Sequence, residues 1–301
     1  MVKVGVVGLG TMGWRIAKVL SEDGLLAGVY NRTTSKAREF SQQFKVPYYE
    51  TPRELASNVD ALISIVADDE AVKSVALGSD GALAGLKRGS LLIEMSTISP
   101  ETSIEIAREA KARGVGMVDA PIVGTSVFVE RREAVVLVGG DYGDYLRARE
   151  VVSHFAREVI YVGPNGYGLY AKLVNNALLG AYVAALAEAV NLGLRLGLSG
   201  EVIQALLARL SSARSPTSEL KVPKMLSRDY STQFALRHIR KDLDIAVKEA
   251  SRARAPLPIT SLALEIYRIA ESMGLGEMDF SSVFELISGN IKAASGPGSK
   301  A

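Results

Sequence analysis

The stretch that decides the fold is Val4-Gly5-Val6-Val7-Gly8-Leu9-Gly10-Thr11-Met12-Gly13, an apolar run followed by three glycines at Gly-x-Gly-x-x-Gly spacing. The run predicts a buried strand, and the residues after Gly10 have the pattern of a helix. In such a turn the first glycine permits a tight bend, the second admits a pyrophosphate, and the third brings helix and strand together. The stretch therefore predicts a dinucleotide-binding βαβ unit whose cofactor-binding residues are Gly8, Leu9, Gly10, Thr11, Met12 and Gly13.

The first half of the chain continues this alternation of strand and helix. Short β-branched runs alternate with helical patterns of about 10 to 15 residues, which is typical of βαβ units around a parallel sheet. Thr51, Asp68 and Ser99 stand where helix N-caps are expected. We expect a Rossmann-type doubly wound α/β domain over residues 1–162, with strands at 2–7, 26–30, 61–66, 91–95, 116–119, 135–139 and 159–162.

The second half of the chain has a different pattern. A stretch of about 30 residues, 168–196, is helical and apolar on nearly all sides, and its length of about 45 Å exceeds one small domain. We expect a long interdomain helix over 163–196, covered by both domains. Only helical periodicities follow, which predicts an all-α domain over 197–293. The tail, 294–301, has nothing to bury and is expected to be disordered.

Composition excludes several classes of protein. The chain has 301 residues, 48% of them hydrophobic, and a net charge of +2 from 35 basic and 33 acidic residues, so a nucleic-acid partner is not expected. It has no cysteine, and it shows no cluster typical of a metal site. No signal peptide precedes the first strand, and the longest apolar run, 177–187, is shorter than the roughly 20 residues that cross a bilayer. We expect a cytoplasmic protein without metal or membrane span.

The end of the second expected strand indicates which dinucleotide binds. NAD enzymes usually carry an acidic residue there for the ribose 2′-hydroxyl. This chain has Asn31, Arg32 and Thr33 instead. The guanidinium of Arg32 suits a 2′-phosphate, and its neighbours add hydrogen bonds without repulsion. The sequence favours NADP over NAD.

A second group of polar residues opens the long helix. Lys172 and Asn176 are four residues apart and so share one helix face, with Asn175 beside them. A dehydrogenase needs a proton acceptor when a hydroxyl becomes a carbonyl, and a buried lysine can serve. The two histidines, His154 and His238, stand in ordinary amphipathic contexts. Lys172 is therefore the candidate general acid/base.

These pieces, in this order, resemble the β-hydroxyacid dehydrogenase family, which includes 3-hydroxyisobutyrate dehydrogenases, L-serine dehydrogenases and glyoxylate/succinic semialdehyde reductases. The resemblance covers nearly the whole chain and rests on residues 8–13, 119–125, 163–176 and 241–243. It implies a substrate loop, a catalytic Lys172 with Asn176 as its partner, and further cofactor contacts. The residues concerned are Ile122, Val123, Gly124, Thr125 and Asn175 for substrate, and Val66, Ala67, Thr97 and Lys241 for cofactor.

The substrate loop departs from the family pattern at two positions. The family usually has Ser and Gly where this chain has Val123 and Thr125, so a hydroxyl is lost at 123, while backbone N–H groups can still meet a carboxylate. We expect NADP-dependent oxidation of a small 3-hydroxy acid, such as L-serine or 3-hydroxyisobutyrate, by a homodimer or homotetramer. The alternatives are a glyoxylate/succinic semialdehyde reductase, an imine reductase and a non-catalytic NADP-binding protein.

Overall fold

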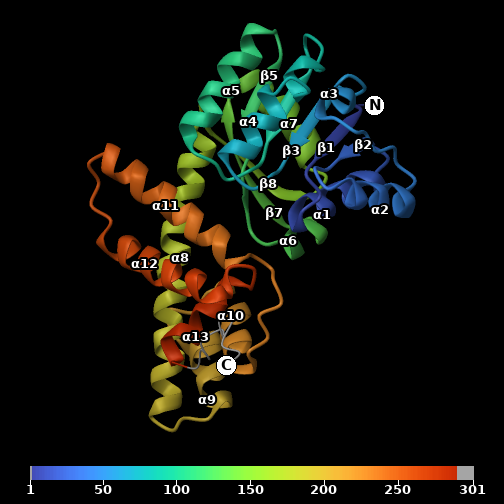
Figure 1. Ribbon diagram of the computed structural model, residues 1–301. Helices are drawn as coiled ribbons and strands as arrows, with labels where there is room; N and C mark the ends of the chain where they lie inside the picture. The colour runs from blue at the N-terminus through green and yellow to red at the C-terminus, as the bar shows by residue number, and fades with distance from the viewer. Residues whose placement is uncertain (1, 290–301) are drawn as a thin grey trace, which may run out of the picture. The chain divides into compact units, whose positions relative to one another are not determined.

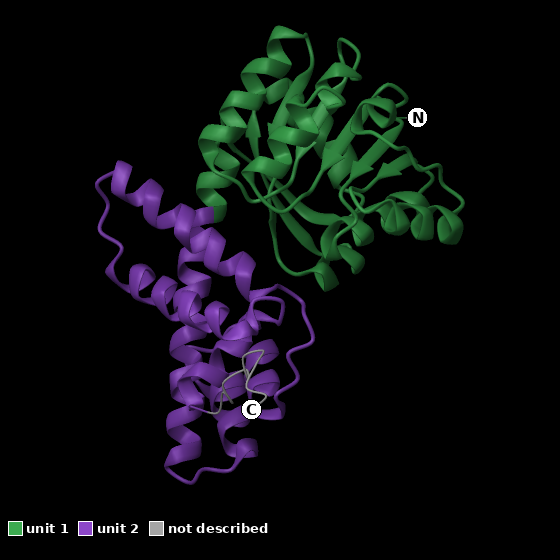
Figure 2. Cartoon of the chain, in the orientation of Figure 1, with its two compact units in different colours: residues 1–172 green, residues 173–301 purple. Residues whose placement is uncertain are grey.

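A computed structural model describes residues 2–289, which divide into two compact units, unit 1 up to residue 172 and unit 2 from residue 173 (Figure 2). Unit 1 contains the sheet, and unit 2 is helical. The tail expected to be disordered, 294–301, lies outside the described residues.

Unit 1 is built on a twisted sheet that has eight strands among the described residues (Figure 1). The strand order is β2-β1-β3-β4-β5-β7-β6, and β8 also pairs with β7. Strands β2, β1, β3, β4 and β5 are parallel, which confirms the Rossmann-type arrangement. The strands are β1 Val4–Val7, β2 Leu26–Tyr30, β3 Ala61–Ser64, β4 Leu91–Glu94, β5 Gly116–Asp119, β6 Ile122–Val123, β7 Ala134–Gly140 and β8 Ala156–Gly163.

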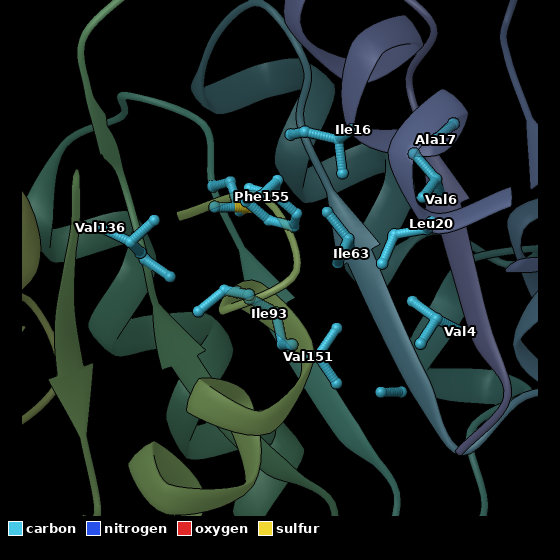
Figure 3. Packing of buried hydrophobic residues seen from close by; sticks show 14 of the residues in the cluster. Val4, Val6, Ile16, Ala17, Leu20, Ile63, Ile93, Val136, Val151 and Phe155 are labelled. Atoms are coloured by element: carbon cyan, nitrogen blue, oxygen red, sulfur yellow. The ribbon is translucent and has the colours of Figure 1, made fainter. Parts of the chain in front are cut away.

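Successive strand residues point to opposite sides of the sheet. Both faces therefore carry apolar side chains, and helices cover each face. Val4, Val6 and Ile63 pack in one core with Ile16 of α1 and Val151 of α7 (Figure 3). The alternate strand residues, including Leu62 and Leu92, pack in a second core with α3, α4 and α5. The helices of this unit are α1 Thr11–Glu22, α2 Thr34–Phe44, α3 Pro52–Ala56, α4 Asp69–Leu77, α5 Pro100–Ala112, α6 Ser126–Glu130 and α7 Tyr142–Val152, with a 3₁₀ turn at Ala82–Ala84.

Three helix starts are confirmed by their caps. Thr51 accepts a hydrogen bond from the Glu54 amide (3.1 Å), Asp68 from the Ala71 amide (2.9 Å), and Ser99 from the Thr102 amide (3.3 Å). Each bond satisfies one of the backbone donors left unpaired at a helix start. The caps fix where α3, α4 and α5 begin.

The sheet departs from the expected parallel arrangement at one end. Strand β7 runs antiparallel to β5 and to β6. Between β5 and β7 the chain has only the two-residue β6 and the five-residue α6. A parallel return would need a longer crossover, usually a full helix, so this short connection reverses the strand direction.

Helix α8, Tyr167–Arg195, starts in unit 1 and continues into unit 2. Among the described residues, it is the one helix long and apolar enough to span a membrane. The core helix of a folded domain can have the same length and composition. Not every side of α8 is buried: Val174 and Leu178 are each 74% exposed. Its other face, which includes Val183, Ala187 and Val190, is buried in the core of unit 2.

Unit 2 consists of helices over its described residues, 173–289, as expected. They are α9 Gly200–Ala205, α10 Pro216–Ser227, α11 Leu236–Arg252, α12 Pro258–Ala270 and α13 Val283–Ser288, with π-helical turns at Leu206–Leu210 and Glu271–Leu275 and a 3₁₀ turn at Phe280–Ser282. The α9–α13 helices pack with α8 around a common apolar core.

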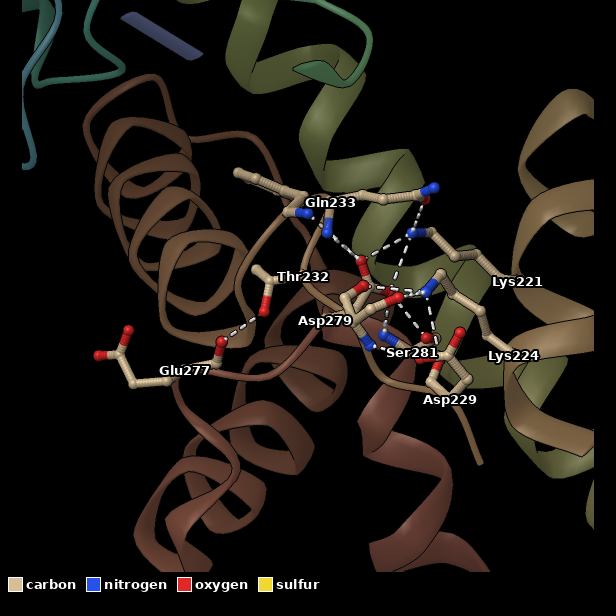
Figure 4. A network of polar contacts seen from close by, with 10 residues as sticks. Lys221, Lys224, Asp229, Thr232, Gln233, Glu277, Asp279 and Ser281 are labelled. Carbon is tan, nitrogen blue, oxygen red and sulfur yellow. Dashed lines mark hydrogen bonds and ion pairs between the residues drawn. The ribbon is translucent and has the colours of Figure 1, made fainter. Parts of the chain in front are cut away.

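A buried ion pair ties three segments of unit 2 together. Lys221 Nζ of α10 lies 2.9 Å from both carboxylate oxygens of Asp279 and 3.1 Å from Gln233 Oε1 (Figure 4). Asp279 also accepts hydrogen bonds from the Gln233, Phe234 and Ser281 amides. A buried charge persists only when it is paired and hydrogen-bonded, so this network fixes the segment that leads into α11.

Candidate active site

The glycine turn has the geometry that a dinucleotide requires. Gly8 has φ +94°, and a Cβ there would lie 2.1 Å from the Ile65 oxygen, while a Cβ at Gly13 would lie 1.9 Å from the Gly8 oxygen. At Gly10 a Cβ would meet nothing within 4 Å. Helix α1 begins at Thr11 with no side-chain cap. Open space beside the N–H groups of a first helical turn fits a pyrophosphate, so the predicted residues 8–13 form a suitable cradle.

Asn31 and Arg32 have different surroundings at the end of β2. The Asn31 Oδ1 accepts the Leu9 amide at 2.9 Å, and its Nδ2 donates to the Thr33 carbonyl at 3.0 Å. Asn31 thereby fastens the glycine turn to the end of β2. Arg32 and Thr33 are exposed beside it. Their side chains are accessible to a ligand, as a 2′-phosphate contact requires.

The loops after β3 and β4 are tied to each other. The Val66 amide donates to Ser96 Oγ at 2.8 Å, and the Ser99 amide donates to Asp69 Oδ1 at 3.1 Å. Ala67 is exposed and Thr97 is partly exposed. The structure therefore brings the predicted cofactor residues Val66, Ala67 and Thr97 onto two cross-linked loops at the carboxyl edge of the sheet, where ligands of open α/β sheets bind.

Asp119 anchors the start of α8 from the end of β5. It is fully buried, and its carboxylate accepts the Gly166 amide at 2.6 Å and the Leu169 amide at 3.1 Å. Burial raises the pKa of Asp119 to about 6, although the hydrogen bonds act in the opposite direction. A Cβ at Gly168 would lie 2.7 Å from this carboxylate, which explains the glycine there. The sequence motif around 163–168 thus fixes the first turn of α8.

Lys172 lies one turn further along α8 and reaches the substrate loop. The residue is 7% exposed, and its Nζ donates to the Ile122 carbonyl at 2.6 Å. Fifty positions separate the two residues in the sequence. The candidate proton acceptor is therefore shielded from water and adjacent to the loop that carries Val123, Gly124 and Thr125.

The substrate loop combines a glycine-only conformation with a polar side chain. Gly124 has φ +122°, in the left-handed range that disfavours other residues. The Oγ1 atom of Thr125 is buried and has no hydrogen-bond partner among the described residues. A buried hydroxyl without a partner costs free energy unless a ligand supplies one. Thr125 thus gives the loop one polar atom suited to a substrate.

The amides predicted beside Lys172 belong to a hydrogen-bonded group in unit 2. Asn176 is fully buried, its Oδ1 accepts from Asn175 Nδ2 at 2.9 Å, and its Nδ2 donates to Asp242 Oδ2 at 2.7 Å. Lys241 Nζ lies 3.1 Å from the other oxygen of Asp242. The structure therefore links Asn175, Asn176 and Lys241 through Asp242, which the sequence analysis did not single out as a site residue.

One other residue was missed. Glu94 is buried at the end of β4, and its Oε1 accepts the amide of Ser96, which is also buried and stands in the segment that the family resemblance implies beside the cofactor, at 2.8 Å. The available signal was an acid that ends the apolar run Leu91-Leu92-Ile93. Taken alone, such an acid is as typical of a solvated strand end as of a site.

A surface cavity of about 550 Å³ lies elsewhere, at the amino-terminal ends of β4 and β5 between α5 and α7. Its lining includes Lys111 and Arg147, which are already paired with Asp141 and Asp144. Ligands of open α/β sheets bind at the opposite edge. We therefore assign the candidate site to the carboxyl edge, where the polar loops converge.

Comparison with known proteins identifies the family of the chain. Residues 3–163 match the family model for the NAD-binding domain of 6-phosphogluconate dehydrogenase. Residues 166–287 match the model described as NAD-binding of NADP-dependent 3-hydroxyisobutyrate dehydrogenase. The two matches cover both units.

Individual relatives span the whole chain. A 2-(hydroxymethyl)glutarate dehydrogenase of Eubacterium barkeri is 31% identical over 95% of this chain and 94% of its own length. An NAD-dependent L-serine dehydrogenase of Pseudomonas aeruginosa is 32% identical over 95% and 98%. The structure of Psf3 with NADP⁺ and 2-OPP is 25% identical, covers 95% of this chain and 100% of its own, and has a TM-score of 0.87. The chain thus belongs to the β-hydroxyacid dehydrogenase family and is an NAD(P)-dependent oxidoreductase that acts on CH–OH groups.

Proposed function

We propose that the enzyme oxidises a small 3-hydroxy acid, such as L-serine or 3-hydroxyisobutyrate, to its semialdehyde with NADP, and that Lys172 is the general acid/base. The observation that carries the proposal is the buried amino group of Lys172, hydrogen-bonded at 2.6 Å to the Ile122 carbonyl of the substrate loop. A proton acceptor must lie within hydrogen-bonding reach of the hydroxyl that it deprotonates. The position of Lys172 beside this loop supports that role.

The chemistry divides between cofactor and chain. Bound NADP supplies the hydride acceptor for the carbon that carries the hydroxyl. Lys172, as the neutral amine, takes the hydroxyl proton, so that the C–H and O–H bonds break and a carbonyl forms. Backbone N–H groups of 122–125 bind the substrate carboxylate. Asn176 orients the substrate by its amide.

The substrate class is supported by the size and polarity of the loop. Val123 and Thr125 stand where the family usually has Ser and Gly, so one polar side chain is moved by two positions along the loop. The unpartnered Thr125 hydroxyl supports a substrate with a further polar group beside its carboxylate, as in L-serine. The relatives named above act on 2-(hydroxymethyl)glutarate and on L-serine, each a hydroxymethyl compound that carries a carboxylate.

The test is the variant Lys172→Ala, assayed on the best substrate of a panel of L-serine, 3-hydroxyisobutyrate and 3-hydroxypropionate. We expect kcat to fall by about 10²- to 10⁴-fold, because general acid/base catalysis contributes that much, while the Kd for NADPH stays within about twofold. Lys111→Ala removes an exposed lysine of the same unit and serves as the control. Turnover near that of the wild type in the Lys172 variant would overturn the mechanism.

The panel also distinguishes the alternatives. Reduction of glyoxylate or succinic semialdehyde with NADPH, without oxidation of any 3-hydroxy acid, would favour the reductase. Turnover of a cyclic imine alone would favour an imine reductase, and cofactor binding without any turnover would favour a non-catalytic protein. A cytoplasmic location and a homo-oligomeric assembly stay predictions.

A further inference from the structure

Three buried polar residues form a row across the carboxyl edge of the sheet. Ser64, Glu94 and Asp119 end three neighbouring parallel strands and are paired in register. Each is at most 1% exposed. Buried polar groups are retained where they are hydrogen-bonded, and the contacts of Asp119 account for its burial, since it anchors α8. Glu94 requires a separate explanation.

The contacts of Glu94 lead toward the cofactor loops. Its Oε1 accepts the Ser96 amide at 2.8 Å, and Ser96 Oγ in turn accepts the Val66 amide at 2.8 Å. One carboxylate thus holds the loop after β4 and, through Ser96, the loop after β3. Asp69 adds a second tie between these loops by accepting the Ser99 amide. The chain Glu94–Ser96–Val66 ends beside Ala67, at the edge where the dinucleotide is expected.

Burial also sets the charge of Glu94. It raises the pKa of this carboxyl to about 7, and the neighbouring Asp119 acts in the same direction, while Ser96 and Ser64 oppose it. Burial therefore favours the neutral form of Glu94. The other oxygen, Oε2, makes no hydrogen bond of normal geometry to a described residue. A glutamine would have the same shape and keep the Oε1 acceptor without the charge.

We propose that Glu94 is a positioning residue of the cofactor site, which holds the loops after β3 and β4 in the conformation that binds NADP. The proposal rests on the proposed function for the assignment of Val66, Ala67 and Thr97 to the cofactor. Glu94 does not touch the reacting atoms. It acts through Ser96, so its loss should weaken cofactor binding rather than remove the proton transfer by Lys172.

The experiment compares the Kd for NADPH, measured by fluorescence titration without substrate, with the melting temperature of the unliganded protein. Glu94→Met keeps the volume but removes the acceptor, and we expect a Kd about tenfold weaker, which corresponds to about 1.4 kcal/mol. Ser96→Ala removes the contact with Val66 and should weaken binding similarly. Glu94→Gln should restore the wild-type Kd to within about threefold. Ser90→Ala, a buried serine that precedes the same strand, is the matched control.

The outcomes separate positioning from stability. A role confined to stability would lower the melting temperature of the methionine variant and leave the Kd unchanged at temperatures where the protein is folded. A wild-type Kd in a folded Glu94→Met variant would overturn the proposal. If Glu94→Met does not fold, Ser96→Ala alone decides. The titration needs no substrate, so a failure of the 3-hydroxy acid assignment would not affect this result.

Discussion

At the scale of single residues, two neighbours at the end of β2 have different roles: Asn31 shapes the glycine turn, and Arg32 is available to the cofactor. Asn31 uses both ends of its amide to hold the glycine turn and the Thr33 carbonyl. Arg32 is exposed beside it. The residue that shapes the turn is therefore distinct from the one available to a 2′-phosphate.

We expect Arg32→Asp to lower the ratio of kcat/KM for NADP to that for NAD by about 10- to 100-fold. Hydrogen bonds to a charged group contribute about 1.5–3 kcal/mol, and the new carboxylate would repel the phosphate while accepting from a ribose hydroxyl. Steady-state kinetics with both cofactors measures the ratio. Arg38→Asp makes the same change of charge on an exposed face of α2 and should leave the ratio unchanged. An unaltered ratio in the Arg32 variant would reject the contact.

Residues differ in how far the sequence reveals them. Arg32 could be singled out from the sequence because it ends the strand that follows the glycine motif. Lys172 could be singled out because a lone charge in an apolar helix is unusual. Glu94 and Asp242 could not, because an acid at a strand end or next to a lysine is common in solvated positions. Their roles depend on burial and on partners such as Ser96 and Asn176, which only the fold brings together.

At the scale of elements, the start of α1 contains two glycines with opposite requirements. A Cβ at Gly13 would lie 1.9 Å from the Gly8 oxygen, whereas one at Gly10 would meet open space. Gly10 also has φ −71°, which any residue adopts. The fold therefore requires glycine at position 13. At position 10 the fold does not require glycine, so a requirement there would come from the ligand.

These two positions give a paired prediction. Gly13→Ala should lower the free energy of unfolding by about 1–3 kcal/mol, the usual cost of overpacking. Gly10→Ala should cost at most about 1 kcal/mol of stability but weaken NADPH binding about tenfold or more, or about 1.4 kcal/mol, because its methyl group would occupy the space of the pyrophosphate. Chemical denaturation and fluorescence titration measure the two effects. Unchanged NADPH affinity in a folded Gly10 variant would show that the cofactor does not approach this turn.

Strands and helices were largely predictable where their own residues carry the hydrophobic pattern. The strands 26–30 and 116–119 have the expected bounds, because turn residues flank each apolar run. The two-residue β6 was missed, and the direction of β7 was wrong. A run of two residues has no periodicity, and strand direction depends on the connection and not on the strand's own sequence.

At the scale of the whole molecule, the composition of α8 does not reveal which of its sides is exposed. Its apolar residues lie on nearly all sides, which predicted a helix covered by both domains, and one stripe is exposed along the helix. Residues at spacings of three, four and seven share a helix face. The stripe consists of Val174, Leu178, Ala185, Glu188, Ala189 and Leu192.

This stripe supports the prediction of a homo-oligomer. Apart from Glu188 the stripe is apolar; an exposed, mostly apolar surface on a folded chain typically marks a contact with another protein, and most oligomers pair identical surfaces about a symmetry axis. We expect light scattering to give the mass of two or four chains for the wild type. Leu178→Lys should shift it toward one chain because it places a charge within the stripe.

The matched substitution tests whether the effect belongs to the stripe. Leu210 is 76% exposed, comparable to Leu178, but lies in the π-helical turn that follows α9. Leu210→Lys should therefore leave the mass unchanged, since it adds the same charge away from α8. A monomeric wild type, or equal masses for wild type and Leu178→Lys, would contradict the assignment. Loss of assembly in both variants would place the contact on a wider surface than this one helix face.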